Sequence, residues 1–351
     1  MSWRVLSLMA GSSADGVTLA LILLRKGETR WRYTLLEGAT IPYPPTLEEA
    51  LRQAFTWPAQ ELLHLSIAYT DWTAEVVRQW RLQRVADLLV WHPHTLYHDP
   101  PGGLTWSLGD GERLRVLTGL PVVHHLRARD IASGGTGAPL IPVADAALFW
   151  EYSTLLNLGG IANLTHLPTH LAYDVTPCNQ LLNALARSAD PTLAYDSEGR
   201  LARQGRFIPA LADLFRSHPF FDRRPPRALD NLTVQNDFIQ PFLAYPASPE
   251  DKLHTATHLI AEKLACSLQE AGAQRFTLTG GGTHNTYLVQ TLLAKLPSSA
   301  PTYLPAPLEL IHYREAIGFG LLGLLRWLHQ PNTHKTWTGA AASHSSGYLS
   351  L

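Results

Sequence analysis

The sequence predicts an α/β protein made of two similar lobes, each a mixed sheet with flanking helices. Two look-alike segments, one in each half of the chain, lead to this prediction: Val5–Leu24 and Ser153–Pro168. Each reads as an apolar run, a turn of glycine and small residues, and a second apolar run, which is the pattern of a β-hairpin. Strand and helix patterns also alternate in both halves, as in α/β proteins with a sheet in each lobe.

Composition supports two well-buried lobes. A chain of 351 residues is too long for a single small core and fits two domains. A content of 46% hydrophobic and 16% charged residues argues against disorder. The net charge of −1 gives no basic excess, so nucleic acid and anionic membranes are poor candidate partners. Cys178 and Cys266 form neither a disulfide framework nor a metal motif, and they fit a reducing cytoplasm. The N-terminus reads as a strand, and no window is long and apolar enough for a membrane span.

Apolar periodicity and turn residues place the elements. The strands expected in the first half are Val5–Ala10, Val17–Leu24, Arg32–Ile41, Ala86–Trp91 and Pro121–His125. Three helices are expected there: one with Thr46 as its N-cap, one at Pro58–Arg81 and one at Leu108–Thr118. Strands expected in the second half are Asp145–Trp150, Leu155–Leu158, Ala162–Leu167 and Arg275–Thr279. Helices expected there are Pro177–Arg187 with Thr176 as N-cap, Phe207–Ser217, Lys252–Gly272, His284–Leu296 and Ile311–His329.

These elements suggest a division of the chain. The first lobe is expected at residues 1–133 and is completed by the C-terminal helix at about 311–351. The second lobe is expected at 134–310, with the Gly-rich segment Arg127–Pro142 crossing between the lobes and a cleft between them. The tail Gln330–Leu351 is expected to be loop, because it lacks periodicity.

The first hairpin turn, GSSADG, carries groups that suit a phosphate. Gly11 and Gly16 permit the turn, and its backbone amides can form an anion-binding nest. Ser12 and Ser13 add hydroxyls, and Asp15 can hold a magnesium ion through water. Paired with the second hairpin, this turn indicates nucleotide binding and phosphoryl transfer. An ordinary hairpin turn is the alternative.

Two further turns follow predicted strands in the second half. LTGGGTHN lets the backbone approach a ligand at a helix N-terminus, where Asn285 could cap the helix or bind a base or ribose. YDVTPCN places Asp174 at a strand end, where an aspartate can act as general base or organise a metal. A tight turn and a simple turn carboxylate are the alternatives for these two segments.

Other polar residues suit recognition of a ligand with hydroxyl and carboxylate groups. Arg127, Arg129 and Asp130 stand beside a flexible glycine stretch, which could equally be a surface linker. The run WHPHTLYHD has the spacing of a conceivable zinc site, although polar lining explains it better without companion cysteines. Glu315 lies on the polar side of an apolar helix and is either functional or simply solvated.

Taken together, these segments resemble the anhydro-N-acetylmuramic acid kinases. The family's FRxxDxAxGGxGAPL signature matches LRARDIASGGTGAPL, and its LNIGGIANLT hairpin matches Leu156–Thr165. Six further family motifs have counterparts here. GTSxDGxD matches GSSADGVT, SHGQT matches WHPHT, and YDxDGxxAxxG matches YDSEGRLARQG. CGGGxxN matches TGGGTHN, KEAxxFAxLG matches REAIGFGLLG, and TGA matches Thr338–Ala340. The family's DTGPGN reads DVTPCN here, so Thr176 and Cys178 replace two glycines.

The resemblance implies a two-lobe actin-like ATPase fold, related to ribonuclease H, acetate kinase, sugar kinases and Hsp70. It implies that ATP, Mg²⁺ and water are used to open the 1,6-anhydro ring and phosphorylate O6, giving N-acetylmuramic acid 6-phosphate for cell-wall recycling. Asp174 matches the family's aspartate base, and Glu315 matches a glutamate near the sugar. A homodimer is also implied, and the apolar final helix would suit its interface.

The residues expected to bind the nucleotide are Gly11, Ser12, Ser13, Asp15, Gly16, Gly159, Gly160, Asn163, Gly280, Gly281, Gly282 and Asn285. The residues expected to bind the sugar are His92, Arg127, Asp130, Gly134, Gly135 and Glu315. The altered turns leave a second function open: a sugar-binding or regulatory homologue with weak catalysis, or a kinase of another small sugar.

Overall fold

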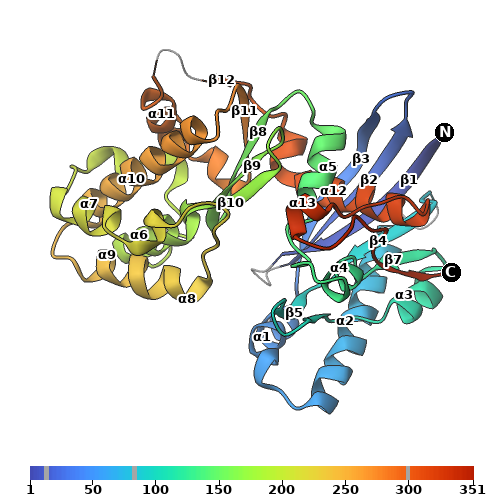
Figure 1. Ribbon diagram of the computed structural model, residues 1–351. Coiled ribbons are helices and arrows are strands. Elements are labelled where there is room, and N and C mark those ends of the chain that lie inside the picture. Colours follow the sequence, from blue (N-terminus) through green and yellow to red (C-terminus); the bar gives the residue numbers. More distant parts are fainter. Residues whose placement is uncertain (12–15, 81–84, 298–300) are drawn as a thin grey trace. The chain divides into compact units, whose positions relative to one another are not determined.

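A computed structural model describes residues 1–11, 16–80, 85–297 and 301–351. The chain forms two compact units (Figure 1). Unit 1 comprises Met1–Trp150 and Tyr313–Leu351, and unit 2 comprises Glu151–His312. The chain therefore leaves unit 1 once and returns to it inside a helix, α12 (Leu308–Trp327). The functional lobes expected at 1–133 with 311–351, and at 134–310, stay a prediction.

The sheet of unit 1 has the strand order β13-β7-β4-β1-β2-β3. Strands β1 (Ser2–Ala10), β2 (Gly16–Lys26) and β3 (Trp31–Pro42) are antiparallel. Strands β4 (Leu88–His92) and β7 (Val122–His124) continue the sheet parallel to β1, and β13 (Tyr348–Ser350) closes it. The core on this sheet includes Leu6, Leu19, Tyr69 and Trp91.

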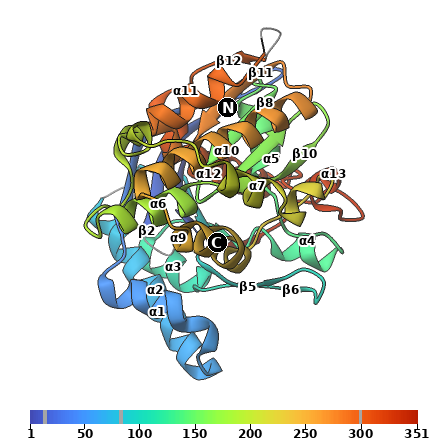
Figure 2. The same ribbon diagram turned by 90° about the vertical axis from the view of Figure 1, so that its left-hand side faces the viewer.

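The helices of unit 1 are α1 (Pro45–Gln53), α2 (Ala59–Gln79), α3 (Gly111–Thr118), α4 (Ala128–Ala132), α5 (Ile141–Leu148), most of α12, and α13 (Lys335–Thr338). A two-stranded ribbon of β5 (Thr95–Asp99) and β6 (Leu104–Ser107) lies beside α4 (Figure 2). Asp110 caps α3 by accepting a hydrogen bond from the Arg113 amide, and Gly119 ends it in the left-handed region.

The sheet of unit 2 has the order β10-β9-β8-β11-β12. Strands β8 (Thr154–Leu158), β9 (Ile161–His166) and β10 (Leu171–Pro177) are antiparallel, whereas β11 (Arg275–Thr279) and β12 (Thr302–Tyr303) run parallel to β8. Its helices are α6 (Asn179–Ala189), α7 (Pro209–Arg216), α8 (Asn231–Thr233), α9 (Gln240–Ala244), α10 (Pro249–Glu270) and α11 (Thr286–Ala294). Helices α10 and α11 pack together on the core of this sheet (Figure 2).

The two sheets share one plan. In each, the third, second and first strands form an antiparallel set, and the next two strands add in parallel beside the first. The predicted fold class, two α/β lobes that each contain a mixed sheet with flanking helices, is confirmed. The shared order also explains why the two hairpin segments look alike in sequence, since each forms the first two strands of its sheet.

Several predicted elements are wrong. Asp145–Trp150 is not a strand: Ile141–Leu148 forms α5, with Pro142 in its first turn, and the third strand of unit 2 is β10. The segment Arg127–Pro142 lies within unit 1. The tail contains α13 and β13, and β13 forms because the edge of β7 offers backbone partners that no sequence period reveals.

Two helix starts are also corrected. Thr176 and Pro177 belong to β10 and pair with Ala162 and Ile161, so α6 begins only at Asn179. Proline is tolerated there because β10 is an edge strand. Helix α1 begins at Pro45, with Pro44 at the N-cap position and no side-chain cap, so Thr46 lies inside the helix.

Candidate functional site

A polar row crosses the sheet of unit 2. Asn157 of β8 pairs with Thr279 of β11 on one side and with Asn163 of β9 on the other, and Asn163 pairs in turn with Asp174 of β10. Directly opposite residues project from the same face of a sheet. Thr279 donates a hydrogen bond to Asn157 Oδ1 at 3.5 Å. The predicted base Asp174 and the predicted nucleotide residue Asn163 are therefore neighbours.

Hydrogen bonds to both the side chain and the backbone amide of Asp174 hold this residue in place. The register of β10 shifts between Asp174 and Thr176, and a bulge of this kind re-aims the neighbouring side chains. The Leu229 amide donates to Asp174 Oδ2 at 2.9 Å, and the Asp174 amide donates to the Arg227 carbonyl at 2.9 Å. Burial raises the pKa of Asp174, and the hydrogen bond from Leu229 opposes this shift. A half-buried carboxylate with a raised pKa has the character of a general base.

The second hairpin turn contacts the start of α6. The amides of Cys178 and Gln180 donate to the Gly160 carbonyl, at 2.9 and 3.1 Å, and the Asn179 amide donates to the Gly159 carbonyl at 3.0 Å. Asn179 Nδ2 also donates to the Leu158 carbonyl at 2.9 Å. These bonds fix the predicted nucleotide residues Gly159 and Gly160 against the helix that follows Asp174.

Thr176 and Cys178, which replace two family glycines, do not project from the surface of unit 2. Both residues are fully buried, and Cys178 is part of the apolar core. Burial raises the pKa of the Cys178 thiol to about 12, so it is an unreactive thiol. The added side chains are thus accommodated inward, within the core.

The glycine turn after β11 packs directly on the same hairpin. A Cβ at Gly280 would lie 2.5 Å from Asn157 Oδ1, and one at Gly282 would lie 2.7 Å from Leu158 Cβ. Gly281, between them, is exposed and has open space where a Cβ would stand. Asn285 accepts a hydrogen bond from the Leu288 amide at 3.0 Å and so caps α11, one of the two roles expected for it.

In unit 1, the first hairpin is present between β1 and β2. Gly16 begins β2 so close to the Ile41 carbonyl that a Cβ would collide with it. Gly11 forms a backbone hydrogen bond with the buried His94 side chain, whose pKa is lowered by burial and raised in part by that bond. Ser12, Ser13 and Asp15 lie outside the described residues, so their predicted roles are untouched by the structure.

Three of the residues expected to bind the sugar form a cluster in unit 1. The His92 ring is buried and stacks on Phe319 of α12, with centroids 3.9 Å apart and an interplanar angle of 11°. Arg127 Nη2 lies 3.4 Å from His92 Nε2, and Arg127 Nη1 donates to the Gly137 carbonyl at 2.6 Å. Burial lowers the pKa of His92, with Arg127 adding to the shift, so the imidazole is neutral and accepts from the guanidinium.

Glu315 belongs to the same electrostatic group. Burial lowers the pKa of Arg127 to about 10, and Glu315 opposes that shift. Desolvation raises the pKa of Glu315 in turn, against the attraction of Arg314 and Arg127. The side chain of Glu315 nevertheless keeps solvent access, and the buried Arg127 Nε has no partner among the described residues. Open donors and acceptors beside one another can bind a polyhydroxylated ligand.

Asp130 has a different environment from the other residues expected to bind sugar. It is completely buried, and its carboxylate accepts from the Gly137 amide and the Thr338 hydroxyl, each at 2.8 Å. Gly135 packs on this carboxylate so closely that a Cβ would collide with Oδ2, and Gly134 adopts a positive φ of 80°. Asp130 thus shapes the glycine loop whose Gly137 carbonyl holds Arg127.

Sequence reasoning missed the ion pair beneath Glu315. Arg314 Nε donates to Asp145 Oδ1 at 3.0 Å and Nη2 binds Oδ2, which makes a bidentate pair between α12 and α5. Both side chains are buried. Burial alone would lower the pKa of Arg314, but Asp145 raises it above its usual range. The sequence pattern predicts a strand at Asp145, so no sequence signal joins this residue to Arg314.

The zinc interpretation of the histidines finds no support in the described residues, which contain no group of three or more histidine, cysteine or acidic side chains placed to bind a metal. His98 instead lies 3.3 Å from Thr105 across the β5–β6 ribbon. Among the helices of the same described ranges, none is long and apolar enough to cross a membrane.

Comparison with known proteins gives consistent matches. A family model described as anhydro-N-acetylmuramic acid kinase matches residues 3–350. A protein of that name from Trichormus variabilis is 33% identical, with 96% of this chain and 94% of the relative covered. One from Synechocystis sp. is 30% identical, with 99% and 98% covered.

Solved structures give more distant matches at 12% identity. Component A of the (R)-2-hydroxyglutaryl-CoA dehydratase of Acidaminococcus fermentans has a TM-score of 0.45, with 90% of this chain and 96% of that chain covered. A ROK family glucokinase from Streptomyces griseus, in complex with glucose and AMPPNP, has a TM-score of 0.41, with 91% and 98% covered.

Proposed function

Because this chain belongs to the anhydro-N-acetylmuramic acid kinase family, we propose that it is an ATP-dependent kinase of anhydro-N-acetylmuramic acid. The reaction opens the 1,6-anhydro ring and yields N-acetylmuramic acid 6-phosphate and ADP. The family match over residues 3–350 is the observation that carries this conclusion, and the environment of Asp174 agrees with it. The two α/β units with one strand plan correspond to the fold of acetate kinases, sugar kinases, Hsp70 and actin.

Asp174 is proposed as the catalytic base. Its carboxylate takes a proton from the water that attacks C1 of the sugar, and the bond between C1 and O6 breaks. O6 then attacks the γ-phosphate of ATP. Such a transfer depends on positioning and charge more than on covalent help. The bulge in β10 and the Leu229 amide supply the positioning of the base.

The sugar-side roles are proposed for unit 1. Arg127 offers a cation and Glu315 a carboxyl group beside the neutral His92, and a ligand with hydroxyl and carboxylate groups suits that combination. Asp130, Gly134 and Gly135 act indirectly in this proposal, because they fix the loop whose Gly137 carbonyl binds Arg127.

The nucleotide-side roles are proposed for the turns. In unit 2 these are Gly159, Gly160, Asn163 and the run Gly280, Gly281 and Gly282, with Asn285 supporting the last as a helix cap. In unit 1 they are Gly11 and Gly16 with Ser12, Ser13 and Asp15. Mg²⁺ prefers oxygen ligands and several waters, and Asp15 is proposed to hold it through water. Bound with ATP, the ion would neutralise phosphate charge.

The alternative, a homologue with weak catalysis or a kinase of another small sugar, gains nothing from these observations. The altered segments DVTPCN and WHPHT motivate this alternative, because side chains at two family glycine positions in the first segment could crowd the phosphates. Thr176 and Cys178 point into the core instead.

A cytoplasmic location and a homodimer are part of the proposal. Both cysteines are free thiols, which suits a reducing compartment. Most apolar residues of α12 in unit 1 are buried, so this helix offers little apolar surface to the expected dimer interface. Exposed Phe55, Leu63 and Ile67 on and before α2 offer a better interface.

The function is tested by incubating the purified protein with ATP, Mg²⁺ and anhydro-N-acetylmuramic acid and identifying the sugar phosphate by mass spectrometry. Asp174→Asn should lower kcat by at least about 100-fold, since general-base catalysis typically contributes that much. Asp213→Asn, on the exposed face of α7, is the matched control and should keep full activity. Absence of product from the wild-type protein would refute the function, and an active Asp174→Asn would refute only the assigned base.

A further inference from the structure

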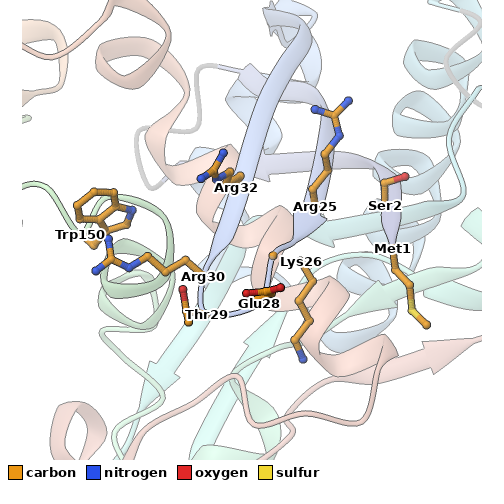
Figure 3. Close-up of a pocket in the computed structure, with 10 residues that line it drawn as sticks. Met1, Ser2, Arg25, Lys26, Glu28, Thr29, Arg30, Arg32 and Trp150 are labelled. Atoms are coloured by element: carbon orange, nitrogen blue, oxygen red, sulfur yellow. The ribbon is translucent and has the colours of Figure 1, made fainter.

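A basic hollow lies at the end of unit 1 that is opposite the first hairpin turn. It has a volume of 830 Å³ and is lined by Met1, Ser2, Arg25, Lys26, Gly27, Glu28, Thr29, Arg30, Arg32 and Trp150 (Figure 3). Four of these residues are cationic and one is acidic. Arg25, Lys26, Arg30 and Arg32 are all exposed, and none forms an ion pair within the described ranges.

Two of the arginines are held against each other by strand register. Arg25 of β2 is the direct partner of Arg32 of β3, and Ser2 of β1 is the partner of Arg25 on its other side. Like charges directly opposite in an antiparallel pair destabilise the sheet. Neither arginine has an acidic register partner that would relieve this repulsion. The two guanidinium groups therefore stand on one face of the sheet, where one anion can bridge them.

An aromatic surface adjoins the cations. The Arg30 guanidinium lies 3.8 Å from the ring centroid of Trp150, which is 48% exposed just after α5, and Figure 3 shows Arg30 extended toward it. Lys26 stands over Trp31 at 5.8 Å. These contacts orient the cationic side chains without neutralising them.

The hollow is remote from the turn of unit 1 that is proposed to bind the nucleotide. Strand β1 runs from Ser2, beside the hollow, to Ala10, beside the turn that contains Gly11. At about 3.3 Å per residue, these two ends of the strand are roughly 25–30 Å apart. None of the residues assigned to the sugar or the nucleotide lines the hollow.

We propose that this hollow, which we name the arginine hollow, binds a compact phosphate anion with two or more negative charges. Arg25 and Arg32 bind its oxygens, and Arg30 adds charge at the rim. The shared chemistry is that of pyrophosphate and of phosphate monoesters. The proposal concerns a site separate from the kinase reaction and does not depend on it.

The test is calorimetric titration of the full-length protein with pyrophosphate, inorganic phosphate and glucose 6-phosphate at low ionic strength. Pyrophosphate is also added during hydrogen–deuterium exchange, where it should protect residues 25–32. Arg25→Gln with Arg32→Gln should weaken pyrophosphate binding at least about tenfold, because hydrogen bonds to charged groups are lost. Tighter binding of glucose 6-phosphate than of pyrophosphate would identify the monoester as the source, and the reverse would identify the free anion.

The matched control is Arg52→Gln with Arg78→Gln. It removes the same charge from two exposed arginines that are paired with Glu48 and Glu75 on α1 and α2. Equal weakening by both double variants would overturn the proposal, because binding would then follow net charge alone. Binding to phosphatidylglycerol vesicles without binding to any of the three anions would also overturn it, in favour of a membrane surface.

A second readout uses the repulsion itself. Arg32→Gln should raise the melting temperature in the absence of anions, by about 1–4 °C, because it relieves the cross-strand repulsion. Pyrophosphate should raise the melting temperature of the wild type and not that of the double variant Arg25→Gln with Arg32→Gln. A lower melting temperature for Arg32→Gln would contradict the argument from register. None of these measurements requires kinase activity, so they can fail independently of the proposed function.

Discussion

At Asp174, two environments act in opposite directions on one carboxyl group. Burial raises its pKa, and the Leu229 amide, which donates to Oδ2, opposes that rise. The net direction is upward, which suits a base that must accept a proton from water and keep it while the C1–O6 bond breaks. The donor lies 55 residues later in the chain.

The pH dependence of kcat/KM should reflect this raised pKa. Asp174 works in its ionised form, so the rate should fall as the pH decreases through the pKa of the folded protein. Because that pKa is raised, the acid limb should lie above the ordinary aspartate value of about 3.9. A rate profile that stays flat down to pH 4, in a protein shown to remain folded, would contradict the role of Asp174.

The same shift predicts the stability of Asp174→Asn. When the pKa of a carboxyl group is higher in the folded than in the unfolded protein, ionisation of that group at a pH above both pKa values destabilises the fold. Replacing the carboxyl group with an amide at neutral pH should therefore not destabilise the protein. The melting temperature of the variant should equal or exceed that of the wild type at pH 7, and any gain should vanish as the pH falls below about 4. A large loss at pH 7 would mark Asp174 as a structural turn residue.

Asp130 should behave in the opposite way. Its buried carboxylate accepts from the Gly137 amide and the Thr338 hydroxyl, so Asp130→Asn places an NH₂ group against a donor. The free energy of unfolding should fall by about 1–3 kcal/mol. Denaturant titration measures it, with Asp99→Asn on the exposed β5 strand as the control. An unchanged stability would show that the loop does not depend on Asp130.

At the scale of elements, α12 joins the sugar-side cluster to the core. Its Phe319 stacks on His92, its Glu315 adjoins Arg127, and its Arg314 is paired with Asp145 of α5. The buried pair fixes the turn of α12 on which Glu315 stands. Arg314, the residue before Glu315, is therefore paired with helix α5 and is not free to bind a substrate.

Breaking this pair should be costly. Arg314→Met leaves the Asp145 carboxylate buried without a counter-charge and should lower the free energy of unfolding by about 3–5 kcal/mol. The double variant Arg314→Met with Asp145→Leu should recover most of that loss, because two apolar residues replace two charges. Denaturant unfolding of the four proteins in this cycle measures the coupling. Additive losses would contradict it.

Elements with local signals could be predicted, and those that depend on distant partners could not. The hairpins β1–β2 and β8–β9 follow from apolar runs around glycine turns, and α10 follows from its long periodic pattern. Residues Asp145–Trp150 look like an apolar strand, yet Pro142 and the partner Arg314 make α5 a helix. Asp174 was predicted at a strand end, but the Leu229 and Arg227 contacts that position it come from a loop without a pattern.

At the scale of the whole molecule, each unit has its own sheet and its own core. Unit 2 is one continuous segment, whereas unit 1 is assembled from two. The duplicated plan could be predicted from the two hairpin sequences. The small strand β13 could not, because three residues near the chain end gain their structure only from the exposed edge of β7.

Unit 2 should therefore fold when produced alone. A fragment of residues 151–312 contains all five strands of its sheet and the helices that cover it. We expect a single cooperative thermal transition and a radius of gyration of about 15 Å, as for a compact domain of this length. Residues 1–150 alone, which lack α12 and β13, are the comparison and should lack such a transition. A fragment 151–312 that scatters like an unfolded chain would refute its independence.

The split of unit 1 has a consequence during protein synthesis. The ribosome delivers the first 150 residues early, but the helix and the edge strand that complete their sheet come only after all of unit 2 has been made. During synthesis, unit 1 therefore remains incompletely folded while unit 2, although it comes later in the sequence, can already fold. The order of folding in the cell would then be the reverse of the order of translation, with the early segment as the natural client of a chaperone.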